Sequence, residues 1–420
     1  MARGLDWGAE RRVLRKFGIK HTNWPCIFLD QYRGTVLSCR YAIPGRQAVK
    51  IAVVDTVMRY PILQVGMTNV ISKTPSWIQL QSLDLTQHIK WLYENFCAQL
   101  DDRFPDIGIE QPHWKITIFR QGSAPVMEVF HEDFLERLNV ENGASNEQTG
   151  LNGDILKLPQ AAPLLPDPNR KFKEHSSQSR AFFMDKSSLL AILGLCRQNK
   201  TTITALMNGL ALISFSSHLD SKAAPAFQSS TIMDHRRNLP PAPPDAPWVR
   251  SDRIVANYVT QLPHRYDTEL VARIRSKLPR VDVHRELWAE IVGKLQDGLR
   301  NDVVGLFKYV TDWQTTMKDM AKRTRQFSWI VTNVGMLDGS GNSTSEDDNN
   351  GQMWSISRAQ FGVSAEIPAA AIEFSPVSVA GQGMCFCANW LDFAVDTTLG
   401  ERIMADLERW LVQLANSRQS

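Results

Sequence analysis

The chain has 420 residues, with 47 Lys and Arg against 44 Asp and Glu, and 43% of its residues are hydrophobic. This composition is typical of a globular protein and excludes collagen, coiled coil and overall disorder as classes. Because a domain usually holds roughly 100–200 residues, the length predicts two domains or lobes. A formal net charge of +3 without a basic stripe gives no reason to expect nucleic acid or an anionic membrane as a partner, so we expect small-molecule partners.

The first part of the chain alternates helical and strand patterns. Residues 52–63 place apolar residues at helical spacing, and the pattern stops at Tyr60-Pro61 because the residue before a proline is pushed out of the helical region. Residues 130–139 (FHEDFLERLN) put their apolar residues on one helical face. Between these two helices we expect a strand fragment at residues 77–80, a helix over residues 85–100 and a half-buried strand over residues 114–120.

The pattern dissolves over residues 140–174, which are rich in Asn, Gly, Pro and charged residues. Such a composition is typical of a linker. We therefore predict an N-terminal lobe over residues 1–165, a linker over residues 166–180 and a C-terminal lobe over residues 181–420.

The second part of the chain also mixes helical and β-rich segments. We expect helices at residues 185–196, 202–215 and 399–414, a mostly helical stretch over residues 270–322, and strands at residues 327–336, 370–379 and 384–390. The helix at 202–215 is nearly apolar throughout, which predicts that it is buried between other layers. Strands and helices alternate without a Rossmann or P-loop glycine motif, so we predict a mixed α/β fold with two lobes around separate sheets.

Six cysteines are scattered through the chain, and only Cys385 and Cys387 lie close together. They fall in an apolar run where alternate residues of a strand are a better interpretation than metal ligands, so we expect no metal site. The charged N-terminus lacks the apolar core of a signal peptide, and no segment approaches the roughly 20 apolar residues of a membrane helix. We expect a soluble protein of the reducing cytoplasm.

No G-x-S-x-G nucleophile elbow and no H-E-x-x-H zinc motif is present, so the nine histidines are the natural candidates for a general base. Four stand in polar surroundings and are expected to be solvated: His21, His88, His113 and His175. His218 and His264 have aspartates nearby, Asp220 and Asp267. His131 opens the helix at 130–139, where it is either a candidate base or a helix-start residue beside two acids.

Taken together, five segments resemble the fungal alcohol acetyltransferase family. They are, in chain order, VDTVMRYPILQVGM at residues 54–67, WIQLQSLDL at 77–85, FHEDFLERLN at 130–139, CRQNKTTITALMNGLAL at 196–212, and SWIVTNVGM at 328–336 with the strands at 361–379. That family belongs to the two-lobed, CoA-dependent acyltransferases of chloramphenicol-acetyltransferase-like fold, which include the condensation domains of peptide synthetases. The resemblance implies an α/β fold in which each lobe is a mixed sheet covered by helices, with a solvent tunnel between the lobes.

The resemblance also implies an activity. It predicts O-acyl transfer from acetyl-CoA or another acyl-CoA, as co-substrate, to a small-molecule alcohol, with no bound cofactor. The setting it implies is fungal secondary metabolism, and the family is often monomeric.

In the family, a strand at the lobe interface ends in H-H-x-x-x-D-G just before the helix that FHEDFLERLN matches. The second histidine is the base that takes the proton of the acceptor hydroxyl, and the aspartate turns towards an arginine of the other lobe. A neutral imidazole at the midpoint of a tunnel can meet the alcohol from one mouth and the thioester from the other. This chain has no two adjacent histidines and no histidine followed four residues later by aspartate.

Two explanations follow for the missing motif. Either the catalytic segment has been lost between about Val129 and Phe130, from the chain or from its gene model, or residues 126–131 form a degenerate strand ending in His131 as the sole stand-in for the base. We favour the first explanation. Acyl transfer remains the predicted function, and the alternative is a catalytically inactive binding protein of acyltransferase fold or a truncated gene product that lacks the catalytic segment.

The loss has a consequence for the arginine that would face the missing aspartate. Arg236 and Arg237 match the family's arginine segment, and the resemblance implies that one of them is the structural partner of that aspartate. A buried arginine without a carboxylate is costly, so it must be solvated or paired with Glu132 or Asp133.

Overall fold

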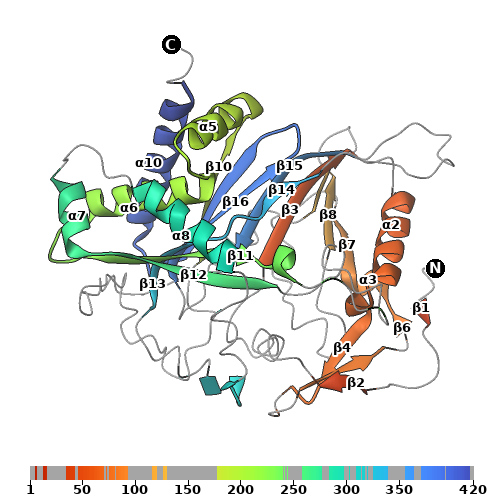
Figure 1. The fold of residues 1–420 in the computed structure, drawn as a ribbon. Coiled ribbons are helices and arrows are strands. Elements are labelled where there is room, and N and C mark those ends of the chain that lie inside the picture. The colour runs from red at the N-terminus through yellow and green to blue at the C-terminus, as the bar shows by residue number, and fades with distance from the viewer. Residues whose placement is uncertain are drawn as a thin grey trace.

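The computed structural model describes residues 5–6, 13–16, 35–42, 46–70, 72, 75–80, 82–92, 116–120, 126–129, 177–239, 241, 244, 258–276, 283–297, 302, 309–313, 315, 316, 319, 325–338, 355–363, 370–392 and 394–416. Two main sheets organise these residues. Figure 1 shows the N-terminal elements, in red and orange, gathered on one side and the C-terminal elements, in green and blue, on the other. This arrangement confirms the predicted mixed α/β class with two lobes.

The C-terminal sheet has seven strands in the order β10-β17-β16-β13-β11-β12, with β14 beside β16. The strands are β10 (Ser177–Met184), β11 (Phe227–Asp234), β12 (Val259–Tyr266), β13 (Phe327–Val331), β14 (Gly335–Leu337), β16 (Ala370–Val379) and β17 (Met384–Leu391). Every residue of β13, β16 and β17 is buried. The predicted strands at 370–379 and 384–390 are confirmed, whereas the predicted strand at 327–336 is two strands, separated by residues 332–334.

Helices cover one face of this sheet. They are α5 (Lys186–Gln198), α6 (Ile203–His218), α7 (Thr268–Arg275), α8 (Val283–Asp297) and α10 (Thr397–Asn416), of which α6 contacts α5, α7, α8 and α10. Asp185, Thr202 and Asp267 each cap the start of a helix with a side-chain oxygen. The helix predicted at 202–215 is α6, and it is buried between the sheet and its neighbours as expected (Figure 1).

The close packing of α10 on the sheet depends on a residue without a side chain. A Cβ atom on Gly400 would lie 2.4 Å from two indole carbons of Trp390, which is fully buried on β17. Gly293 on α8 has no atom within 4 Å of the corresponding position.

Replacing Gly400 by alanine is therefore expected to destabilise the protein, although alanine favours a helix. Overpacking lowers the free energy of unfolding by about 1–3 kcal/mol, and the better helix propensity of alanine offsets at most about 1 kcal/mol of this loss. Gly293→Ala is the matched control, expected to raise the free energy of unfolding by about 0.5–1 kcal/mol because only the propensity changes. Urea unfolding of the two variants measures the difference, and equal values for both would contradict the prediction.

The N-terminal elements form a five-stranded sheet and two small sheets. The five-stranded sheet has the order β15-β3-β9-β8-β7, with β3 (Thr35–Ala42), β7 (Ile89–Leu92), β8 (Ile116–Arg120), β9 (Val126–Val129) and β15 (Ser355–Val363). The small sheets contain β1 (Leu5–Asp6) with β6 (Ser82–Leu83), and β2 (Val13–Lys16), β5 (Ser76–Gln79) and β4 (Val65–Thr68). Helix α2 (Arg46–Arg59) packs Val53 and Val57 against Ile78 and Leu83, and η2 (Pro61–Gln64) follows it.

The predicted helix over residues 85–100 is wrong at residues 89–92, and residues 93–100 lie outside the described residues. A single turn, α3 (Leu85–His88), is followed at once by strand β7. Residues 89–92 pair in parallel with residues 116–119 of β8. This long-range pairing overrides the local helical pattern. A short window of the sequence does not reveal the pairing.

One strand joins the two halves of the chain. β15 is drawn in blue because it comes late in the sequence, yet it lies beside the red strand β3 (Figure 1). Its residues pair antiparallel from Ser355 opposite Ala42 to Val363 opposite Thr35. It also packs against β16 and β17, so Ala359 and Cys39 share an apolar cluster with Val377 and Cys385.

The predicted lobe boundaries stay a prediction, because residues 130–176 lie outside the described residues. Two observations bear on where the chain passes between the sheets. Strand β10 begins at Ser177, within the predicted linker at 166–180, and β15 comes from the predicted C-terminal lobe although it belongs to the N-terminal sheet.

Candidate functional site: polar networks at the sheet junction

The candidate base His131 lies outside the described residues, as do Glu132 and Asp133. The strand before it is described. β9 ends at Val129, two residues before His131, and it lies between β3 and β8 in the N-terminal sheet. The segment named as a degenerate strand in the second explanation therefore does contain a strand, and that strand occupies an interior position of its sheet.

Arg236 and Arg237 lie on the short helix η6 (Arg236–Asn238) after β11, and neither is buried. The guanidinium carbon of Arg236 lies 5.3 Å from the centre of the Tyr258 ring, and its Nη1 lies 3.5 Å from Asp234 Oδ1. Arg237 is exposed. Both arginines are therefore solvated, as expected for an arginine that lacks its aspartate partner. Their role as partners of the missing carboxylate stays a prediction.

A different arginine is buried. Arg325, just before β13, is only 1% exposed, and its burial lowers the pKa of the guanidinium to about 9. The burial of Arg325 could not be predicted, because a lone arginine in RTRQF carries no signal of burial.

The described histidines have acidic partners that are distant in sequence. His218 Nε2 lies 2.8 Å from Asp406 Oδ2, and Asp220 instead accepts from the backbone of Lys222 and Ala223. His264 Nδ1 contacts Glu290 Oε2, whereas Asp267 caps α7. His88, expected to be solvated, is completely buried. The aspartates near His218 and His264 in the sequence are therefore not their partners, because each imidazole lies on an element whose packing partner comes from elsewhere in the chain.

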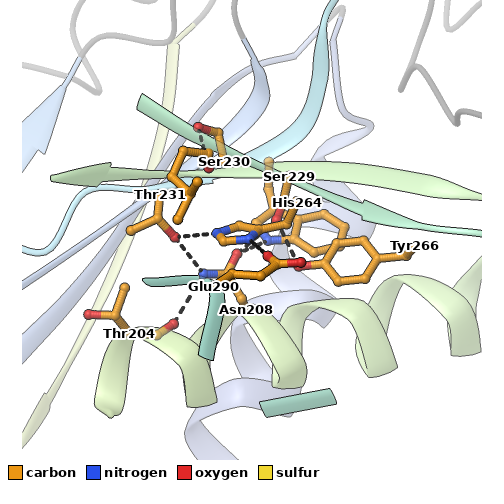
Figure 2. Close-up of polar contacts among 10 residues, drawn as sticks. Thr204, Asn208, Ser229, Ser230, Thr231, His264, Tyr266 and Glu290 are labelled. Atoms are coloured by element: carbon orange, nitrogen blue, oxygen red, sulfur yellow. Dashed lines mark hydrogen bonds and ion pairs between the residues drawn. The ribbon is translucent and has the colours of Figure 1, made fainter. Parts of the chain in front are cut away.

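His264 belongs to a hydrogen-bond network between the C-terminal sheet and α6, drawn in Figure 2. The network is buried except for Glu290 of α8, whose side chain is half exposed. His264 Nδ1 faces the carboxylate of Glu290, and His264 Nε2 lies 2.9 Å from Thr231 Oγ1. These contacts suit a proton on Nδ1 and a hydroxyl of Thr231 that donates to Nε2. Asn208 Nδ2 in turn donates to Thr231 Oγ1 at 3.2 Å.

Asn208 on α6 is the centre of this network. Its Nδ2 also donates to the Thr204 carbonyl at 3.1 Å, and its Oδ1 accepts from Ser229 Oγ and from Trp329 Nε1, both at 2.9 Å. All four hydrogen-bonding positions of the amide are therefore filled. Tyr266 lies 2.8 Å from Ser229 Oγ, and burial raises the pKa of its hydroxyl, which keeps it a donor.

The Thr231, His264 and Glu290 chain has the hydroxyl, imidazole and carboxylate order of a catalytic relay. However, Thr231 is 2% exposed and His264 is 1% exposed, and α6 covers them (Figure 2). The aromatic rings of Phe215 and Tyr266 stack on Trp329 at 5.2 and 5.4 Å beside them. The Thr231 hydroxyl and both imidazole nitrogens of His264 already have hydrogen-bond partners within the protein, so we assign the network to packing and not to catalysis.

A second buried cluster ties the end of β11 to the start of β12 and to α8. Asp302 Oδ2 lies 2.8 Å from His235 Nε2 and 3.0 Å from Lys294 Nζ, and Thr260 donates to Asp302 Oδ1 at 2.8 Å. The side chains of these charged residues are 13% exposed or less. Burial of a carboxylate is tolerated here because three donors satisfy it.

The face of the C-terminal sheet opposite the helices carries a third set of buried polar residues. Along β16 and β17 this face is apolar where β15 crosses it, and becomes polar beyond that crossing. Glu373, Ser375, Cys387 and Asn389 share the face, because Glu373 is paired with Asn389 and Ser375 with Cys387. Gln360 of β15 donates to Cys387 Sγ at 3.6 Å, which places the N-terminal sheet next to this polar region.

We call the four residues Glu373, Ser375, Cys387 and Asn389 the junction floor. Thr332, just after β13, donates to Glu373 Oε1 at 2.6 Å. Ser375 and Asn389 are 0% and 1% exposed, and neither Ser375 Oγ nor Asn389 Nδ2 has a hydrogen-bond partner within the described residues. A buried polar group without a partner is costly, which makes the junction floor a candidate binding surface.

No metal site accompanies these networks in the part of the chain that the structure describes, where no three His, Cys, Asp or Glu residues gather. Cys385 and Cys387 lie in strand β17 as predicted, and neither is in a disulfide. None of the described helices is both long and apolar enough to cross a membrane.

Comparison with known proteins gives the fold an identity. The chain is similar over 98% of its length to the TRI3 trichothecene 15-O-acetyltransferase of Fusarium sporotrichioides, with a TM-score of 0.61 and 11% sequence identity over 97% of that chain. It is also similar to the condensation domain of the monacolin K polyketide synthase MokA, with a TM-score of 0.58 and 9% identity over 97% of this chain and 98% of that one. This chain has the fold of the two-lobed, CoA-dependent acyltransferases.

The sequence comparison agrees with the predicted resemblance. A probable alcohol acetyltransferase, FCK4 of Fusarium pseudograminearum (strain CS3096), is 21% identical, covering 88% of this chain and 86% of that protein. No protein-family model matches the chain. Strand β15 crosses from the C-terminal half of the chain to the N-terminal sheet, so the junction floor lies next to the contact between the two main sheets.

Proposed function

We propose that this protein transfers an acyl group from an acyl-CoA to an alcohol, with His131 as the general base. The observation that carries the proposal is the position of β9, an interior strand of the N-terminal sheet that ends two residues before His131. Support also comes from the probable alcohol acetyltransferase that matches 88% of the chain.

The chemistry needs one base and a dry site between two substrates. The imidazole of His131 takes the proton of the alcohol hydroxyl as its oxygen attacks the thioester carbonyl carbon. The tetrahedral intermediate collapses, the C–S bond breaks, and the thiolate of CoA takes the proton back from the imidazolium. One ester and one free CoA thiol are formed for each acyl-CoA and alcohol consumed, without a metal or a redox step.

The test is release of CoA thiol from acetyl-CoA by the purified full chain in the presence of a panel of alcohols. Replacing His131 by alanine is expected to lower kcat/KM by roughly 10²–10⁴-fold, the usual contribution of a positioned base. His175→Ala, at a histidine in polar surroundings, is the matched control and is expected to leave turnover unchanged. Unchanged turnover in His131→Ala would contradict both explanations of this segment.

A second candidate function is that of an inactive binding protein, and the absent H-H-x-x-x-D-G motif is the observation in its favour. It predicts no turnover with any alcohol but saturable binding of CoA, which isothermal titration calorimetry measures. The genomic sequence between the codons of Val129 and Phe130 tests why the motif is missing. An intron there that encodes the motif in frame would mean an error in the gene model.

A further inference from the structure

Ser375 and Asn389 are the part of the junction floor that the packing of the protein does not explain. They lie on adjacent strands, on one face and in diagonal positions, because Asn389 is opposite Glu373 and Ser375 is opposite Cys387. Diagonal neighbours across an antiparallel pair are roughly 7 Å apart, so one small group or two neighbouring oxygens of a ligand can contact both. The Cys387 thiol donates to Asn389 Oδ1 at 3.8 Å, so Nδ2 is the part of the Asn389 amide that lacks a partner among the described residues.

We infer that Ser375 and Asn389 form a subsite for a second oxygen of the acceptor alcohol, apart from its reacting hydroxyl. Asn389 Nδ2 donates to that oxygen, and Ser375 Oγ donates or accepts. The inference rests on the proposed acyltransferase function and makes it more specific. It names the acceptor class as neutral alcohols with an additional hydroxyl or carbonyl group, such as diols and hydroxyketones.

The absence of a positive charge on Ser375 and Asn389 favours a neutral ligand. Neither Ser375 nor Asn389 is a cation, and Glu373 lies directly across from Asn389. A buried phosphate or carboxylate needs a paired positive charge, whereas a neutral oxygen needs only a hydrogen bond. The subsite therefore suits the acceptor and not the phosphates of CoA.

The experiment compares two alcohols that differ by one oxygen, cyclohexanol and trans-1,4-cyclohexanediol. The double variant Ser375→Ala/Asn389→Leu removes both hydrogen-bonding groups, and leucine keeps the branched shape of the asparagine side chain. The wild type is expected to favour the diol by about 10-fold or more in kcat/KM, and the double variant is expected to lose this preference while cyclohexanol changes by less than about 2-fold. Saturation-transfer NMR with the same two alcohols measures binding without turnover, so a failure of the acyltransferase proposal leaves the subsite testable.

The stability of the double variant supplies a second readout. If the two groups await a ligand, apolar replacements remove an uncompensated cost and the Tm rises by about 1–2 °C. Ser378→Ala is the matched control on the same strand, since Ser378 faces the other way and already donates to the Gly335 carbonyl at 3.0 Å. It is expected to lower the Tm and leave the ratio of the two alcohols unchanged. A wild-type ratio near one in both assays, or an equal preference in wild type and double variant, would overturn the inference.

Discussion

Replacing Asp302 by alanine is expected to lower the free energy of unfolding by about 3–5 kcal/mol. The carboxylate accepts from Thr260 and lies within 3.0 Å of both His235 Nε2 and Lys294 Nζ, in surroundings where its own side chain is 8% exposed. Removing one partner of a buried ion pair leaves the other charge in a poorly hydrated site, and this penalty exceeds the worth of the pair itself. Urea unfolding followed by tryptophan fluorescence measures the change.

A second substitution separates this penalty from a loss of packing. Lys294→Met in the Asp302→Ala background removes the buried ammonium and is expected to restore a large part of the lost stability. Glu401→Ala is the surface control, because the Glu401 and Arg180 side chains are 42% and 60% exposed and such pairs contribute about 1 kcal/mol or less. A double variant as unstable as Asp302→Ala alone would show that the charge of Lys294 is not the cause.

Replacing Asn208 by alanine is expected to cost about 2–4 kcal/mol. The substitution takes the acceptor away from Ser229 Oγ and Trp329 Nε1, and both residues are 0% exposed. Each buried donor without an acceptor costs about 1–3 kcal/mol, and water cannot replace the amide without opening the core. The stacked rings of Phe215, Tyr266 and Trp329 are expected to loosen together, which near-ultraviolet circular dichroism detects.

Asn199 offers a matched control for this prediction. Its Nδ2 donates to the carbonyl of the residue four positions earlier, Leu195, as that of Asn208 does to Thr204. Asn199 is exposed, so Asn199→Ala loses the same bond where water replaces it, and a change under about 1 kcal/mol is expected. Similar losses in the two variants would contradict the assigned role of the network.

The sequence predicted the elements whose patterns are local. Strand β17 follows from the apolar run around Cys385 and Cys387, and helices α5, α6 and α10 follow from apolar spacing and from capping residues such as Asp185. Strand β15 was missed over residues 355–360, because Ser355–Val363 contains Arg, Gln and Gly and is stabilised by pairing with β3, more than 300 positions earlier. No window of the sequence contains that partner.

The site was less predictable than the fold for the same reason. His264 and Glu290 are 26 positions apart, and His218 and Asp406 are 188 apart, so the neighbouring aspartates were poor guides. The unpartnered atoms of Ser375 and Asn389 carry no signal in the sequence, since a serine and an asparagine in a strand read as ordinary solvated residues until burial is known.

By itself, the sequence determined the mixed α/β class from its apolar periodicity, and its resemblance to alcohol acetyltransferases implied the two-lobed acyltransferase fold. The absence of the H-H-x-x-x-D-G motif is likewise a property of the chain alone. Only the tertiary structure decided which acids face the histidines, that β9 lies inside its sheet before His131, and that β15 brings the junction floor against the N-terminal lobe. These features depend on contacts between distant segments. Burial and hydrogen-bond satisfaction arise only when those segments pack.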